Sequence, residues 1–296
     1  MKTTYSVIGE NLFKTYFLMA VFVGLILSLG YLFSYIYEEH LFFYIAIIFA
    51  ILMNIGSYFY GHKFITYITG AKKISKNDLP EVYRILENLS ITAGLPKTPD
   101  LYLIDTPAMN AFATGRNYQN SLVAVTSGLI DNLTKEELEG VIAHELAHIK
   151  NRDITVMMIS SILMGIIATL ADIFLRIGIN SKNEKNNKGI LFIIGIILAF
   201  LAPIFAQLIH LAVSRKREFM ADATGVLFTR NPDGLANALE KIANQKEFLQ
   251  TSPAVAGLFI VNPFKNKKNI TSWLGNLFST HPPVEERIKT LRSMII

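Results

Sequence analysis

Two histidines and a glutamate stand at a spacing that can bind and use a metal ion. His144, Glu145 and His148 form the pattern H-E-x-x-H. Residues four apart on a helix point from one face, so both imidazoles can share one zinc ion. Glu145 lies beside them, where its carboxylate can take the proton of an attacking water. The pattern therefore predicts a zinc peptidase, and the alternative is a buried helix whose histidines are only hydrogen-bonded.

A capped helix is expected to hold this motif. Thr134 and Glu137 have the spacing of a capping box, in which each side chain accepts a hydrogen bond from the other residue's backbone N–H. The apolar residues that follow fall close to one stripe at the helical period, and these are Leu138, Val141, Ile142 and Ile149. We therefore expect a helix that starts at Thr134, packs this stripe on a core and turns both histidines toward a cleft.

A catalytic zinc ion normally has three protein ligands and one open position. The chain has no cysteine, so the third ligand must be a histidine or a carboxylate. Ile154 stands where the metzincin pattern requires its third histidine, which excludes that class. Glu218 is the better candidate, and Asp222, one helical turn later, can accept a hydrogen bond from a ligand histidine. The alternative for Glu218 is a surface residue paired with Arg215 and Arg217.

The composition indicates an integral membrane protein. Of 296 residues, 51% are hydrophobic and 17% are charged, and the mean hydropathy is +0.37. Four apolar blocks are each about long enough to cross a ~30 Å hydrocarbon layer, namely residues 16–36, 41–60, 154–179 and 190–213. We expect four spans in the lipid bilayer. The first is expected to be a retained anchor, because a second follows it without a small-residue cleavage site.

The distribution of charge predicts the orientation. The net charge is +5, and the basic residues lack the aromatic interleaving of a nucleic-acid surface, so we expect no nucleic-acid partner. Glu38 and Glu39 lie between the first two blocks, whereas lysines follow the second block at positions 63, 72, 73 and 76. The positive-inside rule then puts residues 61–153 in the cytoplasm, although Lys185 and its neighbours in the loop between blocks three and four oppose this orientation.

The chain is therefore expected to divide into four segments. Residues 1–60 form a two-span membrane hairpin, and residues 154–213 form a second one. Residues 61–153 and 214–296 then form the two parts of one cytoplasmic catalytic domain, with the third ligand in the second part. Two spans separate the parts, so both return to the same side of the membrane.

The first catalytic segment is typical of compact α+β structure. A helix is expected to start at Pro80 and to end before Gly94, because apolar residues recur between them at helical spacing. Short β-type runs occupy 100–105 and 121–126, with 110–115 between them. The predicted fold class is α+β, mainly helical, with four transmembrane helices and a zincin-like cytoplasmic catalytic domain.

A run of small residues suits peptide binding. Asn110, Ala111, Phe112 and Ala113 fit an exposed sheet edge, which can pair with an extended substrate through main-chain hydrogen bonds. The alternative is an ordinary core strand.

Ionisable residues within the spans allow other functions. Asp172 and Arg176, four apart in the third block, and His210 and Gln207 in the fourth could serve a small transporter or channel. Asp172 and Arg176 can equally form a simple ion pair near the outer interface. The spans show no paired Gly/Pro-broken helices, which argues against a transporter. The intact H-E-x-x-H pattern argues against a catalytically idle membrane chaperone.

Taken together, these motifs resemble one family. H-E-L-A-H at 144–148, S-R-K-R-E-F-M-A-D at 214–222, N-A-F-A-T-G at 110–115 and H-P-P-V-E-E-R at 281–287 are similar to the HtpX family of bacterial heat-shock-linked membrane zinc peptidases. They resemble the CAAX prenyl-protein endopeptidases more distantly. The resemblance covers nearly the whole chain and includes the order of the spans.

The resemblance implies a reaction and a place for it. It implies that His144, His148 and Glu218 bind one Zn²⁺ per chain and that Glu145 is the catalytic base. It further implies that the protein cleaves damaged or misassembled membrane proteins, or unfolded polypeptides, at the cytoplasmic face of the bacterial inner membrane, beside other quality-control proteases. A substrate-specific processing protease is the alternative.

The last motif predicts two further catalytic residues. His281 precedes two prolines that suit the start of a helix, after a stretch of residues 251–280 expected to be a loop or lid. The alternative is a surface turn with a solvated histidine. The H-P-P pattern of the resembled families favours catalysis, with His281, aided by Arg287, donating hydrogen bonds to the oxyanion that develops during attack.

Overall fold

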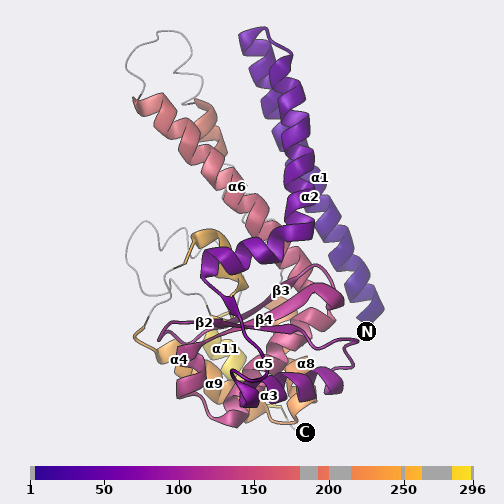
Figure 1. Cartoon of the computed structure of the whole chain (residues 1–296), viewed down its shortest axis with the longest axis vertical. Helices are drawn as coiled ribbons and strands as arrows, with labels where there is room; N and C mark the ends of the chain where they lie inside the picture. Colours follow the sequence, from indigo (N-terminus) through magenta and orange to yellow (C-terminus); the bar gives the residue numbers. More distant parts are fainter. Residues whose placement is uncertain (1–3, 181–192, 200–214, 248–250, 262–281, 295–296) are drawn as a thin grey trace.

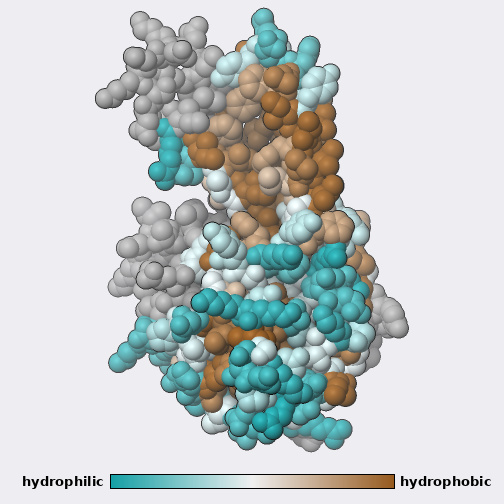
Figure 2. Space-filling model, in the orientation of Figure 1, coloured by the Kyte–Doolittle hydropathy of each residue, from teal (hydrophilic) through white to brown (hydrophobic). Residues whose placement is uncertain are grey.

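The computed structural model describes residues 4–180, 193–199, 215–247, 251–261 and 282–294. Three long helices extend from one side of a globular part (Figure 1). They are α1 (Thr4–Tyr37), α2 (Leu41–Thr69) and α6 (Asp153–Asn180). Apolar residues cover much of these helices on the face seen in Figure 2, whereas the globular part is largely hydrophilic. The fold is thus a group of three long apolar helices, which we call the membrane part, joined to a globular part that holds the H-E-x-x-H motif, which we call the catalytic part after the sequence-based expectation.

Three of the four expected spans are helices long and apolar enough to cross a membrane. By length and composition they are Ile8–Tyr37, Leu41–Thr69 and Asp153–Arg176. The first begins earlier than expected because the helix continues through Asn11 and Thr15, polar residues that are both buried. Residues 193–199 of the fourth block are helical, and the rest of that block, with Gln207 and His210, lies outside the described residues.

The catalytic part contains a four-stranded mixed sheet. Its strands, in the order β1-β2-β4-β3, are β1 (Lys72–Lys73), β2 (Asp100–Ile104), β4 (Ser121–Thr126) and β3 (Ala111–Gly115). β2 and β4 are parallel, and the other two pairs are antiparallel. The three longer strands confirm the expected β-type runs. β1 gave no sequence signal, because two exposed lysines show no strand pattern.

Both faces of this sheet are covered, which explains why its strands do not alternate between apolar and polar residues. Ala111 and Ala113 of β3 pack into the core of the catalytic part with α5 (Lys135–Lys150). Phe112, between them, packs on the opposite face with Met157 and Met158 of α6. Successive side chains of a strand point to opposite faces. One short strand therefore joins the catalytic core to the membrane part.

Helix α5 runs through the middle of the catalytic part. The capping box is confirmed: Glu137 accepts a hydrogen bond from the Thr134 backbone N–H at 2.8 Å, and the Thr134 hydroxyl accepts one from the Glu137 N–H. The expected apolar stripe packs into the core, as predicted, but burial extends around the whole helix, since every residue from 140 to 149 is buried. The surrounding elements are the sheet and the helices α3 (Pro80–Thr92), α4 (Ser127–Asn132), α8 (Arg215–Thr229), α9 (Pro232–Asn244) and α11 (Val284–Arg292).

Short elements complete the described chain. The 3-10 turns are η1 (Tyr118–Asn120) and η2 (Pro253–Leu258). Helix α5 ends at Lys150 and α6 begins at Asp153, which confirms that the motif helix leads almost directly into the third long helix. Asp172 and Arg176 of α6 form the expected ion pair, with a shortest N···O distance of 2.7 Å.

Close contact between α5 and α9 generates a prediction about stability. A Cβ atom on Gly140 would lie 2.7 Å from the backbone nitrogen of Leu235. Gly140→Ala must therefore push α9 away from α5, and overpacking of this kind costs roughly 1–3 kcal/mol of unfolding free energy. We expect a fall of about 2–10 °C in melting temperature, measured in detergent. Gly56→Ala is the control, since nothing lies within 4 Å of its added Cβ. Equal melting temperatures for the two variants would contradict the packing described here.

Candidate metal centre

Three buried side chains converge between α5 and α8. The Nε2 atoms of His144 and His148 lie 3.1 Å apart. Glu218 of α8 places one carboxylate oxygen 3.7 Å from the His144 Nε2 and the other 3.5 Å from the His148 Nε2. The helices approach closely at Gly225, where a Cβ atom would lie 3.1 Å from the His144 backbone nitrogen. The structure thus brings together all three residues that the sequence singled out as metal ligands.

The spacing of these atoms fits a zinc ion. Zinc–nitrogen bonds of about 2.0–2.1 Å in a tetrahedral arrangement put neighbouring ligand atoms about 3.3 Å apart. The observed separations, between 3.1 and 3.7 Å, lie on either side of that value. Both Nδ1 atoms face carboxylates at 2.9 Å and so carry the ring protons. The two Nε2 lone pairs and the Glu218 carboxylate then face one another, which is repulsive unless a cation lies between them.

Asp222 holds the first histidine in this orientation. Its Oδ1 accepts a hydrogen bond from the His144 Nδ1 at 2.9 Å, which settles which ligand it contacts. Arg287 binds the same carboxylate through Nε at 2.9 Å and Nη2 at 2.7 Å. Burial alone would raise the pKa of Asp222, but the charge of Arg287 and the bond to His144 hold that pKa at about 2. Burial, with the charge of Arg287, lowers the pKa of His144 to about 4 and keeps it neutral.

A second carboxylate, which the sequence analysis missed, holds His148. Asp153, at the start of α6, accepts a hydrogen bond from the His148 Nδ1 at 2.9 Å. Its other oxygen accepts one from the Asn11 Nδ2 at 2.8 Å and also contacts Arg217. The position of Asp153, five residues after the second histidine, was a usable signal. Asn11 of α1 was not, because 142 residues separate it from Asp153.

The side chain of Glu145 lies between its own helix, α5, and the edge strand β3. Its side chain is buried, and its carboxylate accepts a hydrogen bond from the backbone N–H of Ala113 in β3. Burial raises the pKa of Glu145 to about 7, an effect that the negative charge of Glu218 reinforces. A general base works best with a pKa near the working pH. This environment therefore suits Glu145 to proton transfer.

The edge strand β3 is not exposed, which corrects the sequence-based expectation. Asn110, Ala111, Phe112 and Ala113 are all buried. Residues 252–261, which we call the strap, lie against the strand. The backbone N–H of Ile260 donates to the Ala111 carbonyl at 3.0 Å, the Asn110 Nδ2 donates to the Val261 carbonyl at 3.0 Å, and Phe259 packs edge-on against Phe112. The end of the strap therefore covers the outer side of β3.

Arg287 contacts the metal centre through Asp222, the carboxylate that orients the ligand His144. The residue is completely buried at the start of α11, and besides Asp222 it binds the Ile260 carbonyl through Nη1 at 3.1 Å. Its Nη2 lies 3.4 Å from the His144 ring nitrogens. Because its donors are directed at Asp222 and Ile260, this geometry favours a positioning role over the expected contact with an oxyanion. The expected helix after the two prolines is present, whereas His281 lies outside the described residues.

Comparisons with known proteins agree with this geometry. Residues 76–295 match peptidase family M48. A protein named protease HtpX homolog from Syntrophobacter fumaroxidans is 47% identical over 84% of this chain and 89% of its own length. Protease HtpX of Legionella pneumophila is 39% identical over 96% of this chain and 99% of its own length.

A solved structure shares the fold. The crystal structure of S. mikatae Ste24p aligns with 97% of this chain and 67% of that protein, with a TM-score of 0.51 and 18% sequence identity. At this identity the likeness concerns the fold alone. It extends over the long helices as well as the catalytic part.

The contact between α1 and Asp153 generates a prediction about metal affinity. Asn11→Ala removes a hydrogen bond that orients Asp153 and, through it, the His148 imidazole. Loss of such outer contacts typically weakens metal binding 10–100-fold, so we expect zinc affinity to fall at least about tenfold in a chelator competition assay. Asn54→Ala is the control, because Asn54 is also buried in a long apolar helix but, among the residues that the structure describes, donates within its own helix, to the Ala50 carbonyl. Equal zinc affinities for wild type and Asn11→Ala would show that α1 does not support the site.

Proposed function

The chain belongs to peptidase family M48, and from that premise we propose that this membrane metalloprotease is a zinc endopeptidase that cuts damaged or misassembled membrane proteins at the cytoplasmic face of the bacterial inner membrane. One observation carries the choice of metal site. Two imidazole nitrogens and a carboxylate converge in a buried place at separations that fit tetrahedral zinc. His144, His148 and Glu218 are the proposed ligands.

The proposed chemistry assigns a role to each residue around this centre. A zinc ion held there supplies Lewis acidity toward the scissile carbonyl and the attacking water. Glu145 accepts the proton of that water and passes it to the leaving amine, for which its raised pKa suits it. Asp222 and Asp153 keep the ligand histidines in the required tautomer. We further propose that His281 donates a hydrogen bond to the developing oxyanion.

We keep the β3 edge as the proposed substrate-binding strand. The strap supports this assignment, because its Ile260 already binds the Ala111 carbonyl as an extended peptide would. The backbone groups of Ala113 lie on the same outer side and next to Glu145. A substrate that pairs with β3 must therefore displace residues 259–261 or bind beside them.

The proposed orientation of the protein in the membrane is based on the charges that flank the spans and on the position of the metal centre. Lysines follow α2, and Glu38 and Glu39 lie at the opposite end of the α1–α2 hairpin. His148 and Glu218 lie close together although the third and fourth apolar blocks separate them in sequence. Two spans between them would carry the chain across the membrane and back to the same side. We therefore propose cytoplasmic locations for residues 61–153 and 214–296 and membrane hairpins for 1–60 and 154–213.

Two substitutions separate the proposed base from the proposed third ligand. Glu145→Gln should abolish cleavage of an unfolded test protein and keep about one zinc ion per chain, because the side chain is a base and not a ligand. Glu218→Ala should lose most of the bound zinc under the same conditions, measured by metal analysis of the purified protein. Glu139→Gln, on the outer side of α5, is the control and should match wild type in both measurements. Full zinc content in Glu218→Ala would overturn the third ligand, and turnover by Glu145→Gln would overturn the base.

Single-cysteine labelling tests the orientation in this cysteine-free chain. A cysteine replacing Asp131, which is exposed near the end of α4, should react with a membrane-impermeant maleimide only after the cells are opened. A cysteine replacing Glu39, between α1 and α2, should react in intact cells and serves as the control. Labelling of the Asp131→Cys protein in intact cells would place the catalytic part outside.

A further inference from the structure

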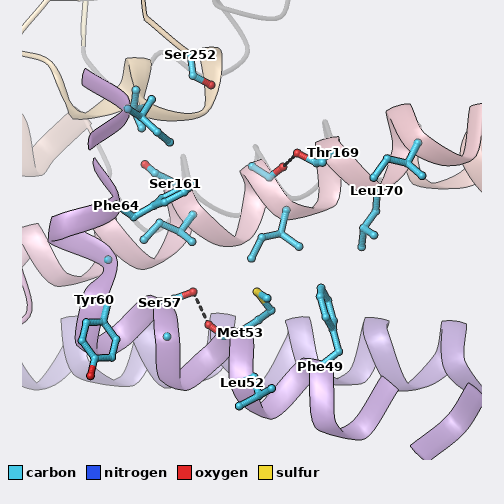
Figure 3. Close-up of a pocket in the computed structure, with 18 residues that line it drawn as sticks. Phe49, Leu52, Met53, Ser57, Tyr60, Phe64, Ser161, Thr169, Leu170 and Ser252 are labelled. Atoms are coloured by element: carbon cyan, nitrogen blue, oxygen red, sulfur yellow. Dashed lines mark hydrogen bonds between the residues drawn. The ribbon is translucent and has the colours of Figure 1, made fainter. Parts of the chain in front are cut away.

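An apolar groove lies between α2 and α6, above the catalytic part. It encloses about 590 Å³ and is lined mostly by apolar side chains of the two helices. Figure 3 shows Phe49 and Met53 of α2 and Leu170 of α6 pointing into the space between the helices. Both helices are candidate membrane spans, so the groove lies where a bilayer would surround it. Its volume is within the range of about 300–1,000 Å³ that is usual for binding sites.

Small residues recur along both walls of the groove. Ser161, Gly165 and Thr169 stand four apart on α6, and Gly56 and Ser57 lie on the α2 wall. Gly61, also on α2, packs against Met158 and Ile162 of α6 and so serves the contact between the two helices. Small residues at this spacing allow the backbone of another helix to approach closely within a membrane. A flexible hydrocarbon chain does not require such spacing. The walls are therefore shaped for a helix more than for a lipid tail.

One hydroxyl that lines the groove makes no hydrogen bond within the part of the chain that the structure describes. Ser57 and Thr169 each donate a hydrogen bond within their own helix, to the Met53 and Gly165 carbonyls (Figure 3). Ser161 also lines the groove and is only 8% exposed, yet it makes no hydrogen bond to any residue that the structure describes. A hydroxyl surrounded by hydrocarbon is more stable when it is hydrogen-bonded. A polypeptide can supply a hydrogen-bond partner to Ser161, and the tail of a lipid cannot.

The groove is continuous with the site of the reaction. Ser252 and Val255, in the first half of the strap, line its end. A few residues later Ile260 binds both the Ala111 carbonyl of the β3 edge and the Arg287 side chain. One short segment therefore contacts the groove, the proposed substrate strand and the support of the metal centre. A substrate lying in the groove would meet the strap directly.

We propose that the groove between α2 and α6 binds an apolar, membrane-spanning segment of the polypeptide substrate. The segment packs its face against the small residues of both walls, as an amphipathic or apolar helix packs into a hydrophobic groove. The chain that follows it then reaches the β3 edge at the strap. This inference rests on the proposed protease function and adds to it the place where the membrane-spanning segment of a substrate binds.

The first test compares an anchored substrate with a free one. Both carry the same unfolded, fluorescently labelled tail, and one also carries an apolar helix of about 20 residues. Gly56→Phe places a ring at a position that lines the groove, where an added Cβ atom would meet nothing within 4 Å. In lipid nanodiscs we expect this variant to lower the ratio of kcat/KM for the anchored over the free substrate about tenfold. Gly24→Phe, equally open but on the exposed side of α1, should leave the ratio unchanged.

The second test needs no cleavage, so it does not depend on how Gly56→Phe folds. In Glu145→Gln protein, Thr169→Cys should form a disulfide with a cysteine placed in the helix of the anchored substrate. Ser28→Cys is the matched control, since Ser28 is an exposed hydroxyl residue on α1 that also bonds the carbonyl four residues earlier. Preferential crosslinking at position 169 supports the groove, and equal crosslinking at both positions overturns it.

The outcomes separate the groove from the protease function. If wild type cleaves both substrates and Gly56→Phe leaves their ratio unchanged, the groove proposal fails and the protease stands. If wild type cleaves neither substrate with zinc present, the protease function fails, whereas the crosslinking result still decides the groove. Capture of a photoreactive lipid in place of the substrate helix at position 169 would show a lipid site and overturn the proposal.

Discussion

The structure around the metal centre depends on one constraint. Three side chains that donate electron pairs, those of His144, His148 and Glu218, lie close together in a buried place. The Nε2 lone pairs of two imidazoles and a carboxylate repel one another unless a cation lies between them, and burial of all three side chains strengthens this repulsion. Each imidazole is fixed by its own carboxylate, Asp222 or Asp153, and each carboxylate by its own arginine. The metal-binding geometry therefore depends on α1, α6, α8 and α11 together, not on the motif helix alone.

The same constraint explains how the membrane part and the catalytic part are joined. Asn11 brings α1 to Asp153, so a membrane helix supports the orientation of His148. Phe112 and the alanines on either side of it send side chains into two different cores, one of them shared with the long helices. A change in the packing of the long helices would thus reach the metal centre through direct contacts and not through a distant pathway.

The sequence predicted what depends on local spacing. The capping box at Thr134, the three longer strands, the start of α3 and the meeting of the ligand residues all follow from patterns within a few residues or from a motif with a known mechanism. The sequence did not predict those parts of the site that depend on contacts between residues far apart in the chain. Asn11 and Ile260 carry no local pattern that points to the site, and the edge of β3 is covered by a segment about 150 residues later in the chain. The sequence singled out Arg287 as an aid to oxyanion binding, whereas its partners, Asp222 and the Ile260 carbonyl, could be known only from the fold.

X-ray absorption at the zinc edge of the purified, zinc-loaded protein tests the central claim most directly. The account predicts a shell of nitrogen and oxygen atoms at about 2.0–2.1 Å that includes two imidazoles and a carboxylate. Glu218→Gln should change the oxygen contribution and leave both imidazoles in place. A shell with one imidazole or three, or an unchanged shell in the Glu218→Gln protein, would contradict the claim that these three residues form the metal centre.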